Sequence, residues 1–167
     1  MDSSGIIQIL RQNHIQYVVC VPCAEISDLL AAIEESGAFR VIIPNREDEG
    51  MDLLMGLAIS EKRCLGLFQD TLLGNTQNVF GMLTRCMRIP ISLWLASRAN
   101  EFFNENLAHE YITNNFHNLV MDDAISKHTI YLNRQDKQAL STNQTRILAG
   151  SLKSGSNFLN IVQLVVS

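Results

Sequence analysis

Three acidic residues begin a stretch of the chain whose residue types could move a proton. Glu47, Asp48 and Glu49 follow a short β-rich run, residues 40–44, and precede an apolar helical pattern. A carboxyl group at this kind of junction lies where open α/β sheets bind their ligands. It could be a solvated acid that complements the positive start of a helix, or an acid directed into a cleft where it transfers a proton. The local pattern leaves both interpretations open.

A Cys-x-x-Cys sequence, Cys20 to Cys23, follows the first predicted strand and precedes a helix. That is the context of a thioredoxin-like redox motif, because a helix start lowers the pKa of a thiol. However, Cys20 is predicted to be the last inward-facing residue of the strand, and no aromatic residue precedes the motif. Pro90 could imitate the proline that faces such a dithiol, but it is distant in sequence. Buried structural cysteines are the favoured interpretation.

Polar residues and a glycine follow the third predicted strand, from Gln69 to Asn75. They suit the close approach of a ligand, although a loop capped by Asn75 near a helix start explains them equally well. The four histidines lack metal-ligand spacing, so no metal site is predicted, and only His109 falls near the predicted strand ends. The sequence contains no Ser-His-Asp arrangement and no phosphate-binding glycine loop.

The composition indicates a globular protein that does not bind nucleic acid. A length of 167 residues suits one domain, residues 1–167. Only 18% of residues are charged, which suggests that a partner covers part of the surface. The net charge is −4 and no stripe of basic residues is present, which argues against nucleic acid as a ligand. Because no apolar run could span a bilayer and no signal peptide is apparent, we expect no membrane association, a cytoplasmic location and reduced cysteines.

Strands and helices alternate along the sequence. The patterns predict strands at 17–21, 41–43, 64–68, 91–95, 128–132 and 160–166, and helices near 6–10, 26–33, 51–58, 79–86, 105–115 and 135–153. This alternation predicts an α/β fold with a parallel sheet of about six strands flanked by helices. Ser3 or Ser4 is expected to cap the first helix, and Gly37 to end the second.

In their order and spacing, these segments resemble the sulfopyruvate decarboxylase α subunits. These are pyrimidine-binding (PYR) domains of a thiamine diphosphate enzyme, and phosphonopyruvate decarboxylase is a close relative. The resemblance covers roughly residues 5–100 well and the remainder loosely. It rests on Val21-Pro22-Cys23, residues 45–50, Leu67-Phe68-Gln69, Leu73-Gly74-Asn75, Ile89-Pro90-Ile91 and Ser97-Arg98.

The resemblance implies a catalytic role for Glu47. The family has one glutamate followed nine residues later by a helix glycine, and Glu47 and Gly56 have this spacing whereas Glu49 does not. Such a glutamate hydrogen-bonds the pyrimidine ring of thiamine diphosphate, and the cofactor then decarboxylates a 2-keto acid. Sulfopyruvate, which yields sulfoacetaldehyde, is the favoured substrate. Phosphonopyruvate is second, and another decarboxylation or carboligation in a biosynthetic pathway is third.

The resemblance also assigns binding roles to other positions. Residues 21–23 would lie beside the cofactor, and the segment from Gln69 would line the aminopyrimidine or the substrate. The acidic group of the substrate would meet Arg98, whose planar fork suits oxyanions, although a surface ion pair is an equally good account of this arginine. The implied cofactor-binding residues are Val21, Pro22, Cys23, Gln69, Thr71, Gly74 and Asn75, and the implied substrate-binding residues are Arg98 and His109.

Two segments depart from the family pattern, and one motif of thiamine diphosphate enzymes is absent. Leu72 replaces a glycine, and a leucine cannot easily adopt positive φ, so a displaced loop is expected. Residues 99–103 replace a glycine-rich segment. The Gly-Asp-Gly…Asn motif that holds the diphosphate through Mg²⁺ is absent, so a separate pyrophosphate-binding β subunit would carry most of that site, in an α₂β₂ or larger assembly. A non-catalytic regulatory subunit that kept the fold is the alternative.

Overall fold

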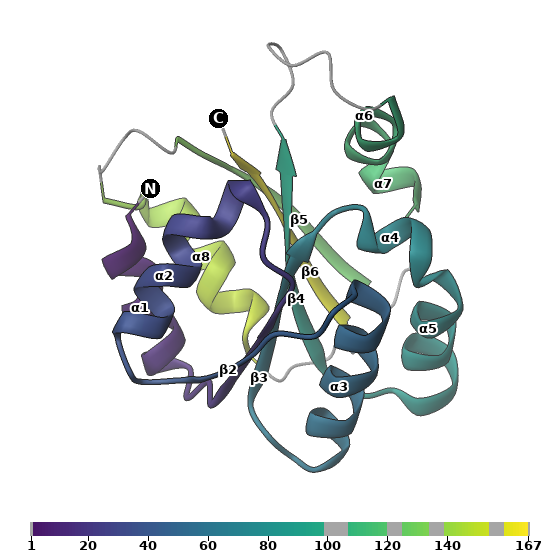
Figure 1. The fold of residues 1–167 in the computed structure, drawn as a ribbon, viewed down its shortest axis with the longest axis horizontal. Helices are drawn as coiled ribbons and strands as arrows, with labels where there is room; N and C mark the ends of the chain where they lie inside the picture. Colours follow the sequence, from purple (N-terminus) through teal and green to yellow (C-terminus); the bar gives the residue numbers. More distant parts are fainter. Residues whose placement is uncertain (1, 99–106, 120–124, 134–138, 154–158, 167) are drawn as a thin grey trace.

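The computed structural model describes residues 2–98, 107–119, 125–133, 139–153 and 159–166. Its six strands form one entirely parallel sheet in the order β2-β1-β3-β4-β6-β5 (Figure 1). The predicted α/β class and strand number are therefore confirmed. The strands are β1 (Tyr17–Cys20), β2 (Arg40–Ile42), β3 (Cys64–Gln69), β4 (Ile91–Arg98), β5 (Ile125–Leu132) and β6 (Leu159–Val166).

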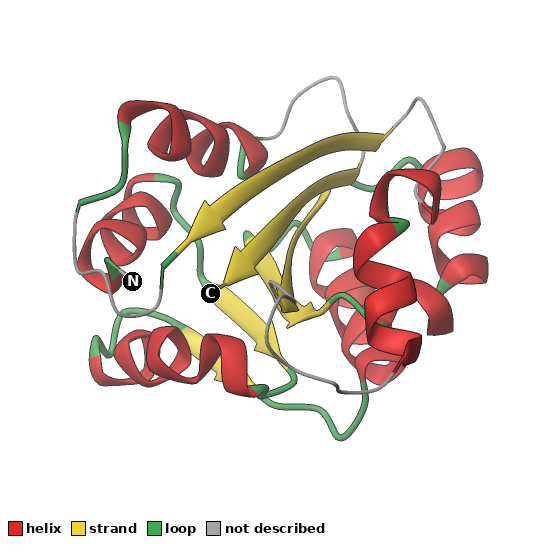
Figure 2. Cartoon of the chain, turned by 90° about the horizontal axis from the view of Figure 1, so that it is seen from above, coloured by secondary structure: helices red, strands yellow, loops and turns green. Residues whose placement is uncertain are grey.

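Helices cover both faces of the sheet (Figure 2). The first face is covered by α1 (Ser3–Gln12), α2 (Ser27–Glu35) and α8 (Thr142–Ser151), with the 3₁₀ turn η1 (Ala24–Ile26) leading into α2. The second face is covered by α3 (Glu47–Ile59), α4 (Leu72–Asn75), α5 (Gln77–Gly81), the π-helix η2 (Met82–Met87), α6 (Leu107–Asn114) and α7 (Phe116–Leu119). None of the described helices combines the length and apolar character needed to cross a membrane.

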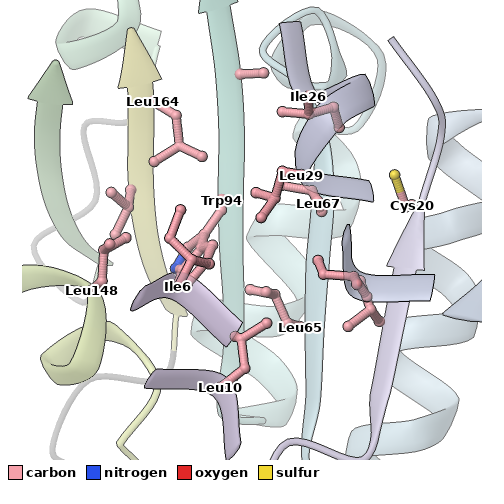
Figure 3. Packing of buried hydrophobic residues seen from close by; sticks show 14 of the residues in the cluster. Ile6, Leu10, Cys20, Ile26, Leu29, Leu65, Leu67, Trp94, Leu148 and Leu164 are labelled. Carbon is pink, nitrogen blue, oxygen red and sulfur yellow. The ribbon is translucent and has the colours of Figure 1, made fainter. Parts of the chain in front are cut away.

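Each face of the sheet carries its own hydrophobic core. On the first face, the buried Trp94 of β4 lies among Ile6 of α1 and Leu148 of α8 (Figure 3). The indole Nε1 of Trp94 donates a hydrogen bond to the Ser151 hydroxyl at 3.0 Å, so its polar atom is satisfied inside the core. On the second face, Phe68 of β3 belongs to the cluster that packs under α3. The sheet is thus buried on both sides, which explains its nearly continuous apolar strands.

Local details differ from the sequence predictions in two helices, whereas a third helix ends as predicted. Asp2, rather than Ser3 or Ser4, caps α1, because its carboxylate accepts a hydrogen bond from the Gly5 amide at 3.0 Å. This bond and a second from the Ser4 hydroxyl lower the pKa of Asp2. The helix expected at 79–86 is the short α5 followed by the π-helix η2, which ends at Met87. The next residue, Arg88, has a φ of 51°. Gly37 follows α2 with φ of 58°, as expected of a residue that ends a helix.

Close packing between α3 and β3 fixes the place where α3 begins. A Cβ atom added at Gly50 would lie 2.6 Å from Cε1 of Phe68, and one at Gly66 would lie 2.5 Å from Cδ1 of Leu54. Neither position therefore tolerates a side chain without movement of the helix or the strand. Glu47 is the first residue of α3, so this packing also determines where its carboxyl group is held.

Two glycines of α3 are expected to respond to alanine in opposite ways. Gly50→Ala should lower the free energy of unfolding by about 1–3 kcal/mol, because the added methyl group overlaps the Phe68 ring. Gly56→Ala should raise it by about 0.5–1 kcal/mol, because Gly56 is exposed with open space around its Cα and alanine favours helix. Urea denaturation of both variants measures the difference. Equal effects would contradict the close packing at Gly50.

Candidate functional site

The carboxyl ends of four neighbouring strands bring most of the predicted site residues to one edge of the sheet. Because β2, β1, β3 and β4 are adjacent and parallel, the segments that follow them leave the sheet side by side, at the upper end of the strands in Figure 1. This edge is where α/β sheets place ligands. The segments are Val21–Cys23 after β1, Ile43–Glu47 after β2, Gln69–Thr71 at the end of β3, and Arg98 at the end of β4.

Glu47 differs from the two acids beside it. The Asp48 carboxylate accepts a hydrogen bond from Nε of Arg46 at 3.1 Å, and Oε2 of Glu49 accepts one from the Asn45 amide at 3.1 Å. The half-buried Glu47 carboxylate has no hydrogen-bond partner among the residues that the structure describes. A carboxylate held at a helix start without an internal partner is available to a ligand. Glu47 is thus the acid of this turn best placed for chemistry.

The segment after β1 combines exposed and buried positions. Pro22 is exposed, whereas Val21 and Cys23 are half-buried. Burial raises the pKa of Cys23 to about 12, and a hydrogen bond to Glu25 adds to the rise. Burial likewise raises the pKa of Cys20 to about 12, with a further contribution from the charge of Glu34. Thiols with such pKa values are poor nucleophiles at neutral pH, so this pair does not have the activated thiolate that dithiol oxidoreductases need.

Alkylation of the native protein should reveal the unreactive pair. At pH 8 a thiol with a pKa of about 12 is ionised in only about one molecule in ten thousand. We therefore expect iodoacetamide to modify the exposed Cys86 long before Cys20 or Cys23. Mass spectrometry of tryptic peptides at successive times measures this order, and denatured protein is the control. Rapid modification of Cys23 in the native state would revive the redox interpretation.

The segment after β3 folds as a helical turn where the sequence predicted a loop. Leu72 begins α4 and is fully buried in the second core. Its φ is not positive, so the helical turn replaces the glycine-type loop and accommodates the leucine. Gly74 is exposed beside α6, where an added Cβ would lie 3.6 Å from Cδ1 of Ile112. Asn75 is the last residue of α4 rather than a cap near a helix start. The Thr71 hydroxyl lies 3.5 Å from Oε1 of Gln69.

The two predicted substrate-binding residues are described only by their backbones. Arg98 is the last residue of β4, paired in register with Val166 of β6, and His109 lies in α6. Their side chains are outside the described part of the structure. Within the described residues, no cluster of three or more His, Cys, Asp or Glu side chains could hold a metal ion.

A buried polar network, which the sequence did not predict as part of the site, joins the carboxyl ends of β3 and β4 and the middle of β6 to α6. Asp70 is 1% exposed, and its Oδ2 accepts hydrogen bonds from the hydroxyls of Ser97 at 2.6 Å and Thr113 at 2.7 Å. Gln163 continues the network by donating to the Ser97 hydroxyl at 3.0 Å and accepting from Thr129 at 3.0 Å. Asp70 thereby fastens α6 to the carboxyl edge of the sheet.

One sequence signal could have revealed this network. Gln163 is a polar residue within the otherwise apolar run 161–166, and all eight residues of β6 are buried. A buried amide requires partners, and those partners lie on neighbouring elements. The sequence pattern therefore indicates that Gln163 belongs to a buried polar network. It does not reveal that Asp70 and Ser97 are the other members, because that depends on the order of the strands.

The fold of this chain is similar to part of a larger solved structure. The structure aligns with 2-oxoglutarate:ferredoxin oxidoreductase from Magnetococcus marinus, solved with 2-oxoglutarate, coenzyme A and succinyl-CoA bound, at a TM-score of 0.64. The alignment covers 99% of this chain and 28% of that chain. Because the identity is only 10%, the similarity supports the fold and not a shared function.

Sequence similarity is more specific, although no family model matches the chain. The α subunit of sulfopyruvate decarboxylase from Methanocaldococcus jannaschii is 30% identical over 98 residues, which are 59% of this chain and 58% of that subunit. The α subunit from Methanococcus maripaludis is 26% identical over 98 residues, 59% of each chain. The matches thus span less than two thirds of these relatives. The predicted resemblance to sulfopyruvate decarboxylase α subunits is confirmed.

Proposed function

We propose that this chain is the pyrimidine-binding subunit of a thiamine diphosphate-dependent 2-keto acid decarboxylase, and that residues 1–167 form one PYR domain. The observation that carries the proposal is the position of Glu47. It begins α3 at the carboxyl edge of the sheet, half-buried and without a hydrogen-bond partner in the described residues. The similarity to sulfopyruvate decarboxylase α subunits supports this assignment.

The residues at this edge fit the pyrimidine end of the cofactor. When bound, thiamine diphosphate supplies the nucleophilic carbon and the electron sink that decarboxylation requires. Glu47 would share a proton with the pyrimidine ring nitrogen, which needs a carboxyl group free of other partners. Residues 21–23, with Gln69, Thr71, Gly74 and Asn75, would line this end of the cofactor or the substrate. Arg98 and His109 would lie near the acidic group of the substrate.

A second subunit is part of the proposal. Its pyrophosphate-binding site would hold Mg²⁺ and the diphosphate, in an α₂β₂ or larger assembly. The naming of the relatives as α subunits supports the existence of such a partner. Exposed apolar residues next to β2 and along α3 also favour a partner that covers this helix. They are Ile43 at 52%, Leu53 at 41% and, at the far end of α3 from Glu47, Ile59 at 56% exposure.

Sulfopyruvate is the leading proposed substrate and phosphonopyruvate the second. The test is a decarboxylation assay on this chain co-expressed with a pyrophosphate-binding subunit, in the presence of thiamine diphosphate and Mg²⁺. We expect release of CO₂ from sulfopyruvate that needs both chains. A complex that binds the cofactor but consumes neither acid would overturn the substrate assignment. Failure of the complex to bind the cofactor would favour a regulatory subunit instead.

A further inference from the structure

A cavity of about 390 Å³ lies at the opposite edge of the sheet from Glu47. Its lining includes Cys64, Ser92 and Asn160, which are at the amino ends of β3, β4 and β6. Because all strands are parallel, these positions are the far ends of the strands whose carboxyl ends hold the candidate active site. A molecule bound in this cavity would therefore occupy a separate site.

The cavity concentrates positive charge on an acidic protein. Lys62, Arg63 and Lys153 line it together with a single carboxylate, that of Glu61, whereas the whole chain has a net charge of −4. The two lysines are exposed to solvent, and Arg63 is half-buried. Cations gathered in a concave site attract anions and hold them more strongly than cations scattered over a convex surface.

The guanidinium of Arg63 is held in place by the ends of two helices. Its Nη2 donates to the carbonyl of Asn13, which follows α1, at 3.2 Å, and to the carbonyl of Leu152, which follows α8. Among the described residues, Nε and Nη1 have no hydrogen-bond acceptor. An arginine anchored through one nitrogen keeps donors free for an anion and loses little conformational freedom when it binds one.

Asn160 adds an uncharged polar group to the lining of the cavity. It is only 8% exposed and lines the cavity, yet its amide has no hydrogen-bond partner in the described part of the chain. Ser92, which pairs with Asn160 across the two strands, does not donate to this amide, because its hydroxyl donates to the carbonyl of Ser151 at 2.6 Å. Because the side-chain amide lines the cavity and carries both N–H donors and a carbonyl acceptor, it offers a donor and an acceptor to a molecule bound there.

We propose that this cavity binds a small phosphate monoester. Arg63, Lys62 and Lys153 contact the phosphate group, whose charge of about −2 is balanced by these three cations together with the Glu61 carboxylate. The Asn160 amide hydrogen-bonds a hydroxyl or carbonyl group of the organic part. The proposal does not depend on the decarboxylase function, because it concerns the opposite edge of the sheet and can be tested without partner subunit or cofactor.

The test compares inorganic phosphate with glycerol 3-phosphate on the full chain at low ionic strength. Isothermal titration calorimetry gives both affinities, and ¹H–¹⁵N spectra locate binding through the amides of residues 62–64 and 153. We expect both anions to bind, with glycerol 3-phosphate tighter. The double variant Lys62→Ala, Lys153→Ala should weaken both by about tenfold or more.

Two further variants separate the contacts. Asn160→Leu, which keeps the side-chain size, should remove the preference for glycerol 3-phosphate and leave phosphate affinity nearly unchanged, with the melting temperature confirming that the variant folds. Arg146→Ala removes a cation from α8 outside the cavity, where it is bound to Asn143, and should change neither affinity. The proposal would be overturned if neither anion binds, or if Arg146→Ala weakens binding as much as the Lys62→Ala, Lys153→Ala double variant. It would also be overturned if the preference for glycerol 3-phosphate survives Asn160→Leu.

Discussion

Replacing Glu47 by glutamine is expected to lower the turnover of the assembled enzyme by about 10²-fold or more, in the range typical of lost proton-transfer catalysis. Glutamine has nearly the same size and can still hydrogen-bond, but it cannot share a proton with the cofactor. The carboxylate has no internal partner in the described structure, so the fold should be unaffected. The rate of CO₂ release at saturating thiamine diphosphate measures the loss, and size-exclusion chromatography checks that the complex assembles.

Glu49→Gln is the matched control for this experiment. Glu49 lies in the same helical turn, but its Oε2 accepts a hydrogen bond from the Asn45 amide at 3.1 Å. A glutamine oxygen can accept the same bond, so turnover should change by less than about threefold. If the two variants lose equal activity, the choice between the acids is wrong. If Glu47→Gln remains fully active, the proposed proton transfer itself is refuted.

Replacing Asp70 by alanine should lower the free energy of unfolding by about 2–4 kcal/mol, because hydrogen bonds to charged groups are strong and buried donors are costly to leave unpaired. The hydroxyls of Ser97 and Thr113 would lose their shared acceptor. Asp70→Asn retains one side-chain oxygen and should cost about half as much or less. Urea denaturation of the isolated chain, followed by circular dichroism, measures both values.

Asp48→Ala is the control for the loss of an acid. Asp48 has a side chain 41% exposed and pairs with Arg46 on the surface at 3.1 Å, so its removal should cost no more than about 1 kcal/mol. The comparison separates a buried network from an ordinary surface charge. A loss for Asp70→Ala no greater than for Asp48→Ala would show that Asp70 does not hold α6 to the sheet.

Most of the fold follows from the pattern of apolar residues. Most of the strands were predictable because they are short apolar runs bounded by polar or turn residues. β5 is the exception, since its first half, residues 125–128, is mostly polar and only residues 128–132 were predicted. Parallel pairing follows from the intervening helices. Strand order was not predictable from these signals, since neither β5 nor β6 carries a residue that selects its neighbour. The capping of α1 by Asp2 and the π-helix at Met82–Met87 also depend on contacts and geometry that periodicity does not encode.

The candidate site was predictable where it follows the strand ends directly. Glu47 and Cys23 could be located because strand carboxyl ends in a parallel sheet meet at one edge. The Asp70 network could not be predicted from the sequence. Its members Ser97, Thr113 and Gln163 come together only through the order of β3, β4 and β6 and the position of α6. The helical conformation at Leu72 was also missed, since the expectation relied on a glycine pattern that this chain does not share.

The position of β6 has a consequence for the order of events during synthesis. Residues 159–166 form the strand that lies between β4 and β5, both of which precede it in the chain. Until the ribosome has released these residues, β5 lacks its only neighbour in the described sheet, and β4 can pair only with β3. Completion of the sheet therefore depends on contacts between residues far apart in sequence, which form slowly. A nascent chain that stalls before residue 159 would expose two unpaired strand edges, which are prone to aggregate.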